Sequence, residues 1–140
     1  MKTIAASLLI AAAQAGAAVP ASKVCISNSA GFVMNFYFDD ILTGEKSART
    51  DNYDIDQTKC LGIADAIKDV KENDVILTYT KAILGETQTV DTAIQYSADA
   101  GTVSYTCTGT TLNYDCKLNG EEALAQKIAV FFTQFAHIMD

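Results

Sequence analysis

Four cysteines in a chain of 140 residues constrain its fold more than any other feature. In a short secreted chain an even number of cysteines indicates a disulfide framework, and four cysteines allow three pairings. None of them has the Cys-x-x-Cys spacing that is typical of a redox centre or a zinc site. We therefore expect structural bridges, with no metal and no cofactor, among Cys25, Cys60, Cys107 and Cys116.

The amino-terminal segment has the pattern of a secretory signal peptide. Lys2 precedes an apolar run from Ile4 to Ala13, and small residues suited to cleavage follow. The run is about half as long as the roughly 20 residues that a membrane-spanning helix needs. We expect a signal peptide over 1–18, one secreted domain over 19–140 in an extracellular compartment, and no integral membrane span.

Alternation of apolar and polar residues favours one cysteine pairing. Two segments separated by Gly109–Thr111 carry apolar side chains at every second position: Val103, Tyr105 and Cys107, then Leu112, Tyr114, Cys116 and Leu118. This pattern is typical of a β-hairpin. A register with 107 opposite 116 places both sulfurs on one face, within bridging distance. Cys107–Cys116 and Cys25–Cys60 are thus preferred, although sequence alone leaves the other pairings open.

Further alternating segments predict a mainly β protein. The clearest strand starts at Gly31 and places apolar side chains on one face at Phe32, Met34, Phe36 and Phe38. Other strands are expected over 75–84, 24–27, 58–61 and 92–96, with a helical turn within 63–70 and a turn at 97–101. Short strands with frequent turn signals favour a disulfide-stapled antiparallel β-sandwich or small barrel.

The last twenty residues change to helical spacing and predict an amphipathic helix over about 121–139. Its apolar stripe consists of Leu124, Ile128, Phe131, Phe132, Phe135 and Ile138. Either the helix packs on the sheet, or Phe131, Phe132 and Phe135 dock on a partner protein. A lipid interface is less favoured, because Lys127 is the only basic residue on the polar side.

Charge and residue types narrow the classes of function. The chain has 17 acidic and 10 basic residues, for a net charge of −7. An acidic surface repels phosphate, which argues against nucleic acid and against purely electrostatic membrane association. His137 is the only histidine and lies near the carboxyl terminus, and the cysteines are expected in bridges. Catalytic triads are therefore not predicted, and we expect no enzyme activity.

An acidic loop over 51–56 is the main candidate for small-ligand binding. Asn52, Asp54 and Asp56 alternate in the way that suits a calcium ion, although the match to an EF-hand is partial. Tyr53 lies among them and is expected to stack on a sugar ring. A glycan-binding module, with or without calcium, is therefore one hypothesis. A loop that is simply solvated is the alternative.

Paired carboxylates give a third hypothesis. Glycosidases need two carboxyl groups at a suitable separation, and Asp39 with Asp54 is the pair considered. The adjacent Asp39 and Asp40 end the aromatic strand, and such residues usually lie in solvent. A carboxylate-dependent hydrolase is therefore less favoured than binding.

The plan of the whole chain resembles that of small secreted proteins of filamentous fungi, including effector-like proteins released toward a host. The resemblance depends on Met1 to Ala18, the single-domain length and the few, even-numbered cysteines. It implies a secreted β-rich binding protein without catalytic residues. The first hypothesis is accordingly a non-enzymatic interaction protein that binds a host or cell-surface protein.

Overall fold

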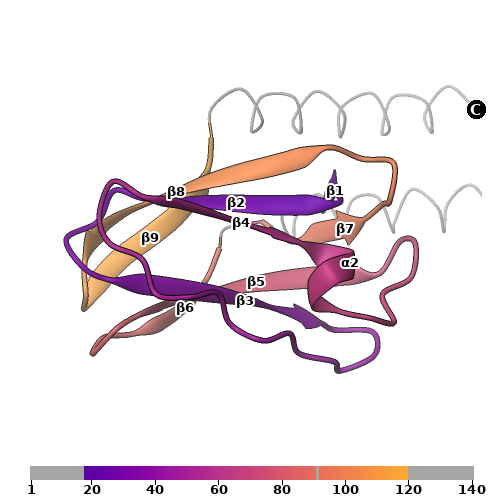
Figure 1. The fold of residues 1–140 in the computed structure, drawn as a ribbon, viewed down its shortest axis with the longest axis horizontal. Helices are drawn as coiled ribbons and strands as arrows, with labels where there is room; N and C mark the ends of the chain where they lie inside the picture. Colours follow the sequence, from indigo (N-terminus) through magenta and orange to yellow (C-terminus); the bar gives the residue numbers. More distant parts are fainter. Residues whose placement is uncertain (1–17, 91, 120–140) are drawn as a thin grey trace, which may run out of the picture.

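The computed structural model describes residues 18–90 and 92–119, which form two stacked β-sheets (Figure 1). One sheet has the order β1 (Val19–Ala21), β7 (Ile94–Tyr96), β5 (Val75–Ala82) and β3 (Met34–Asp40), with β6 (Thr87–Thr89) also paired to β5. The other has the order β4 (Thr58–Gly62), β2 (Lys23–Asn28), β8 (Thr102–Thr110) and β9 (Asn113–Leu118). A short helix, α2 (Ile63–Ala66), follows β4. The expected sandwich is confirmed, and the described strands do not close into a barrel.

The core forms where the alternating faces of the two sheets meet. Met34, Phe36 and Phe38 of β3 are fully buried, as the alternation from Gly31 predicts. Ile26 of β2 and Tyr105 of β8 are buried on the opposite sheet. Burial of each large apolar side chain contributes about 1.5–3 kcal/mol. The period of two in the sequence therefore accounts for the packing of the layers.

The pairing of the strands differs from the all-antiparallel expectation. β2 runs parallel to β8, and β1 runs parallel to β7. The first pair joins segments far apart in the sequence, which no local pattern reveals. β1 contains Pro20 and lies at a sheet edge, where a residue without an N–H is tolerated. This strand was not predicted from the sequence, where Pro20 lies at the boundary of the expected signal peptide.

The cysteine hairpin has the predicted register, with Cys107 opposite Cys116. Disulfides join this pair and also Cys25 to Cys60, which face each other across β2 and β4. The predicted turn at Gly109–Thr111 is wrong, because β8 continues to Thr110. Gly109 is instead a strand residue with φ 122°, where a Cβ would clash with Asn113 O. The turn consists of Thr111 and Leu112.

Two predicted segments fall outside the described residues. They are the signal peptide, except for Ala18, and the C-terminal helix with Phe131, Phe132, Phe135 and His137. Within the described part of the chain, no helix is long and apolar enough to cross a membrane.

Removing the two disulfides separately should have unequal effects. The Cys25–Cys60 bridge spans 35 residues and the Cys107–Cys116 bridge spans 9. On the loop-entropy model, their loss to alanine pairs should lower the free energy of unfolding by about 4 and about 3 kcal/mol, respectively. Urea titration of both double variants measures this. A larger loss for the Cys107–Cys116 pair would show that burial of this bridge outweighs loop entropy.

Candidate functional site

The prediction that Tyr53 is an exposed platform for a sugar is wrong. Its side chain is only 2% exposed, and its hydroxyl donates a hydrogen bond to Ile26 O at 3.0 Å. Burial raises the pKa of this hydroxyl, so it remains protonated and keeps its role as a donor. The backbone of Tyr53 also pairs with that of Met34. Tyr53 therefore fastens the acidic loop to the core.

The remaining oxygens of the acidic loop do not assemble a calcium site. Asp54 and Asp56 are exposed, while Asn52 Oδ1 accepts a hydrogen bond from Asn35 Nδ2 at 2.9 Å. Among the described residues, no group of three or more His, Cys, Asp or Glu side chains is placed to hold a metal ion. The geometry thus gives no support to calcium-assisted glycan binding by this loop.

The carboxylates considered for hydrolysis lie far apart along β3. Tyr53 pairs with Met34 at the start of this strand, so Asp54 lies at that end, whereas Asp39 lies five residues further along. At about 3.4 Å per residue this is roughly 17 Å. Glycosidases place their two carboxyl groups about 5 to 9.5 Å apart. Asp39 and Asp54 therefore do not form such a pair.

The expectation that Asp40 lies in solvent is also wrong. Asp40 is fully buried, and its Oδ1 accepts hydrogen bonds from the backbone N–H groups of Leu42 and Thr43, which compensate for the loss of water. These bonds close the turn after β3, and the same side chain contacts Asp74 on the other side. Only Asp39, on the opposite face of the strand, is partly exposed.

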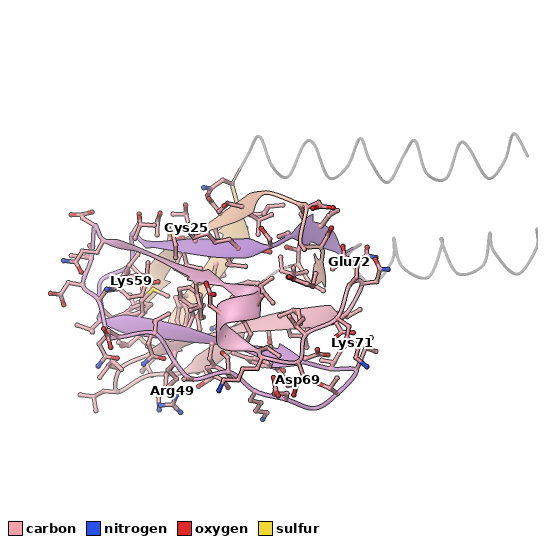
Figure 2. The ribbon with its side chains drawn as sticks, turned by 45° about the vertical axis from the view of Figure 1, so that its right-hand side comes forward. Cys25, Arg49, Lys59, Asp69, Lys71 and Glu72 are labelled. Atoms are coloured by element: carbon pink, nitrogen blue, oxygen red, sulfur yellow. A yellow bond between two sulfur atoms is a disulfide. The ribbon has the colours of Figure 1, made fainter. Side chains whose placement is uncertain are left out.

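The other strand tyrosines are occupied within the protein. Tyr37 stacks on Tyr79 with ring centroids 5.4 Å apart, and the Arg49 guanidinium lies over the Tyr37 ring at 5.9 Å. Arg49 projects from the outer side of the five-stranded sheet (Figure 2). Tyr37 is therefore in contact with two neighbours of its own chain and is only partly exposed. Tyr96 is buried, so its ring is not available to a ligand.

One end of the sandwich instead displays apolar side chains to solvent. Leu84 is 96% exposed in the turn between β5 and β6, and Leu112 is 70% exposed in the turn between β8 and β9. Ile55, also exposed, lies in the loop that precedes β4 at the same end of the molecule. We call Ile55, Leu84 and Leu112 the apolar tip.

The two hairpin turns of the apolar tip are held side by side. Glu86 N donates a hydrogen bond to Thr111 O at 3.2 Å, which joins the turns directly. Gly85 allows this approach, because a Cβ at that position would come within 2.5 Å of Thr111 O. The two exposed leucines therefore belong to one surface.

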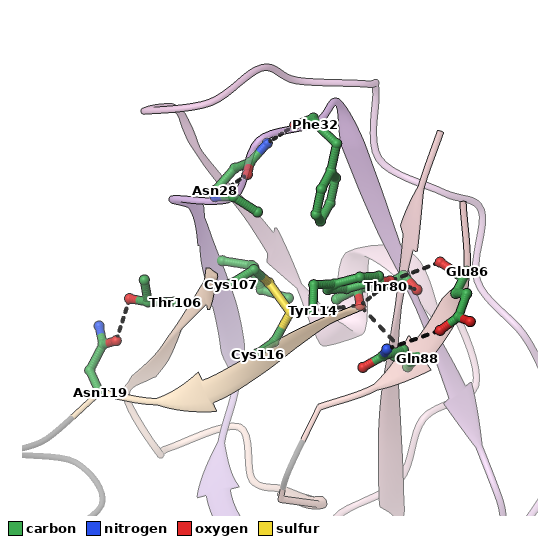
Figure 3. The surroundings of a disulfide bond; sticks show 12 residues. Asn28, Phe32, Thr80, Glu86, Gln88, Thr106, Cys107, Tyr114, Cys116 and Asn119 are labelled. Atoms are coloured by element: carbon green, nitrogen blue, oxygen red, sulfur yellow. Dashed lines mark hydrogen bonds between the residues drawn. A yellow bond between two sulfur atoms is a disulfide. The ribbon is translucent and has the colours of Figure 1, made fainter. Parts of the chain in front are cut away.

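Tyr114 anchors this surface to the core (Figure 3). Its ring packs on Phe32 with centroids 4.7 Å apart, next to the buried Cys107–Cys116 bridge. Its hydroxyl lies 3.0 Å from Thr80 O and 2.9 Å from Glu86 O, both on the opposite sheet. The same residue thus fixes the position of both hairpins.

Leu84 adopts a backbone conformation that is unfavourable for its type. Its φ is 63°, in the left-handed region, where a bulky side chain is uncommon and glycine or asparagine is preferred. This conformation costs about 1–2 kcal/mol for an ordinary residue. A leucine that is both strained and exposed contributes little to folding. Strained residues of this kind are concentrated at functional sites.

The loops at this end carry one sign of charge. Segments 29–33, 54–57, 83–86 and 111–112 contain Asp54, Asp56 and Glu86 but no lysine or arginine. The three acidic residues are exposed. The apolar tip is therefore bordered by negative charge, and two of the predicted site residues, Asp54 and Asp56, belong to this border.

The two leucines themselves were missed in the sequence. Leu112 continues the alternation of Tyr114 and Cys116, so it resembles a core position, and Leu84 resembles the last residue of a strand. With Cys107 opposite Cys116, Thr110 lies opposite Asn113, which leaves Thr111 and Leu112 as a two-residue turn. The predicted register therefore contained the signal that Leu112 is in a turn.

Tyr53→Phe should lower the free energy of unfolding by about 1 kcal/mol, because it removes one buried hydrogen bond to Ile26 O and leaves the ring in place. Urea titration at neutral pH measures the change. Tyr37→Phe is the matched control, since no hydrogen bond is found for the Tyr37 hydroxyl in the described structure, and we expect less than about 0.5 kcal/mol there. Equal effects would contradict the anchoring role of Tyr53.

Leu84→Asn should raise the free energy of unfolding by about 0.5–1 kcal/mol, because asparagine tolerates the left-handed conformation better than leucine. Leu112→Asn, at a position without a positive φ, serves as the comparison and should change stability little. Thermal and urea unfolding measure both. Destabilisation by Leu84→Asn would show that the leucine side chain supports the fold.

No protein-family profile matches the chain, and no curated protein matches it. Among solved structures, pneumolysin is similar at a TM-score of 0.41 and 14% identity, over 72% of this chain and 24% of that one. Listeriolysin O is similar at 0.40 and 17% identity, over 70% and 22%. The chain thus spans about a quarter of their length, and the similarity is too low to support an argument about function.

Proposed function

We propose that this chain is a secreted, non-enzymatic interaction protein that binds a host or cell-surface protein through the apolar tip. The main support is that Leu84 and Leu112 are 96% and 70% exposed in two hairpin turns that a backbone hydrogen bond joins. The signal-peptide pattern supports secretion. The two disulfides are compatible with an extracellular protein.

The chemistry of the tip defines the partner that it fits. Two leucines and Ile55 project from turns, so they suit an apolar depression on the partner. Asp54, Asp56 and Glu86 border them, so basic side chains around that depression would be complementary and would speed association. Anionic lipid is disfavoured by the same charges. A protein surface with an apolar pocket and a basic rim is therefore the proposed target.

Binding is favoured over catalysis by what the described residues do with their reactive groups. All four cysteines are in disulfides. Asp39 and Asp54 are at different ends of β3, and Asp40 is used to close a turn. A rigid scaffold with an exposed apolar tip needs none of these groups to be reactive.

A binding experiment with matched variants tests the proposal. The disulfide-intact chain is immobilised and exposed to extracellular fluid from the setting into which it is released, and the retained protein is purified for affinity measurement. Leu84→Asn/Leu112→Asn should weaken binding about 100-fold, since two buried leucines contribute at least about 3 kcal/mol together. Added salt and Glu86→Gln should slow association.

Ile41→Asn/Leu42→Asn is the matched control, because these two residues are also exposed but lie at the opposite end of the sheet. It should bind like the unmodified chain. Equal loss of binding in both double variants, or none in either, would refute the role of the tip. Tip-dependent sedimentation with phosphatidylcholine vesicles, without a retained protein, would assign the tip to lipid and also refute the proposal.

A further inference from the structure

Two carboxyl groups meet at the end of the sandwich opposite the apolar tip. Asp40, the last residue of β3, lies opposite Ile76 of β5, and Asp74 directly precedes β5. Asp40 and Asp74 project to the inner side of the sheet, where Asp40 is fully buried and Asp74 is 6% exposed. Their side chains are within hydrogen-bonding reach of each other. Such closeness of two acids is unfavourable if both are ionised.

Each carboxyl group also holds a turn. Asp40 Oδ1 accepts hydrogen bonds from Leu42 N at 3.0 Å and Thr43 N at 3.3 Å. Asp74 Oδ2 accepts a hydrogen bond from Lys71 N at 3.0 Å. The contact between the two acids therefore connects the turn after β3 with the loop before β5, which carries Lys71 at the edge of the molecule (Figure 2).

The second carboxyl oxygen of Asp40 is the atom that remains available for a bond to Asp74. Asp40 Oδ2 is buried and receives no hydrogen bond from any N–H or hydroxyl donor. Within the described residues the one ion pair within salt-bridge distance is Lys117–Asp115, so neither Asp40 nor Asp74 forms a salt bridge. Two carboxyl groups can hydrogen-bond to each other only when one of them carries a proton. Asp40 Oδ2 has no other partner, so a proton on this oxygen would have the Asp74 carboxylate as its acceptor.

We propose that Asp40 and Asp74 share one proton and form a pH-sensitive latch between the turn at 41–44 and the loop at 67–74. With the proton bound, Asp40 donates to Asp74 and both turns are held. When it is lost, two negative charges face each other in a buried position and the latch opens. The turn that it releases presents Ile41 and Leu42, which are both exposed.

The electrostatics of the pair agree with this assignment. Burial, and then the hydrogen bond with Asp74, raises the pKa of Asp40, while the N–H groups of Leu42 and Thr43 oppose this in part. The hydrogen bond from Asp40, followed by that from Lys71 N and by the Lys71 charge, lowers the pKa of Asp74. The proton therefore belongs to Asp40.

The two acids contribute to stability with opposite pH dependence. The raised pKa of Asp40 contributes stability that is present below the ordinary aspartate value and is lost as the pH rises through the raised value. The lowered pKa of Asp74 contributes stability that is present above the ordinary value and is lost as the pH falls through the lowered one. The latch is thus strongest between the lowered pKa of Asp74 and the raised pKa of Asp40, and it opens as the pH rises through the raised pKa of Asp40.

Few other charged groups face the pair. Lys71 acts on Asp74, and Glu45 lies opposite Asp40 across the turn, where Glu45 O accepts a hydrogen bond from Asp40 N. Asp39 lies on the other face of the strand, and its backbone forms a β-bridge with that of Lys46. In the 67–74 loop, Lys68 and Asp69 are exposed, and Glu72 Oε2 accepts a hydrogen bond from Ala98 N. No charged residue belongs to β7.

Carbon-13 NMR of the side-chain carboxyl groups tests the latch in the full chain with its disulfides intact. Asp40 should titrate above the ordinary aspartate range and Asp74 below it, as a coupled pair. The amide signals of Leu42 and Thr43 should shift with the Asp40 titration. If both acids titrate independently in the ordinary range, the proposal is wrong, whatever the variants do.

Three variants separate a shared proton from simple packing. Asp40→Asn keeps the turn acceptor and offers an N–H to Asp74. As the pH rises through the raised pKa of Asp40, the melting temperature of the unmodified chain should therefore fall, whereas this variant should show no such fall. Asp74→Asn should lower the pKa of Asp40, because its amide then donates to that carboxylate. Asp39→Asn, on the other face, should leave the profile unchanged. A profile for Asp40→Asn like that of the unmodified chain would overturn the latch.

Discussion

The contact that the rest of the structure depends on is made by Tyr114, which connects the two sheets at the end that carries the apolar tip. Its ring packs on Phe32 in the core, and its hydroxyl reaches the backbone of Thr80 and Glu86 across the sandwich. Burial raises the pKa of this hydroxyl, so it remains a donor. Because Tyr114 is placed by the disulfide hairpin, covalent and packing constraints act on the same surface.

Local patterns predicted most of the long strands and the preferred cysteine pairing, but not the short strands β1 and β6. The alternation through Phe36 and Phe38 fixes which face of β3 is buried, and the alternation around Cys107 and Cys116 fixes their register. Both are properties of neighbouring residues, so they are visible without a fold. The parallel pairing of β2 with β8 depends on contacts between distant segments, and nothing in either strand specifies the partner.

Burial of polar residues was the main source of error at the candidate sites. Tyr53 and Asp40 both stand next to acidic residues in the sequence, which is typical of exposed loops. Each is buried because it satisfies backbone groups: Tyr53 donates to Ile26 O, and Asp40 accepts from the turn after β3. A sequence shows the residue type but not the donor that will meet it. Leu112 is the opposite case: it continues the alternation of Tyr114 and Cys116, yet the turn exposes it.

The two ends of the sandwich are therefore stabilised in different ways. At the apolar tip, the disulfide, Tyr114 and the bond from Glu86 N to Thr111 O are insensitive to pH in the physiological range, so the exposed leucines keep their positions. At the other end, the turns depend on two acids, neither of which forms a salt bridge within the described part of the chain. The strand β5 connects the two ends, because Tyr114 contacts Thr80 within it and Asp74 directly precedes its first residue, Val75. The pH-insensitive tip and the pH-sensitive turns therefore lie at opposite ends of one strand. A constant binding surface can then coexist with a turn that responds to acidity.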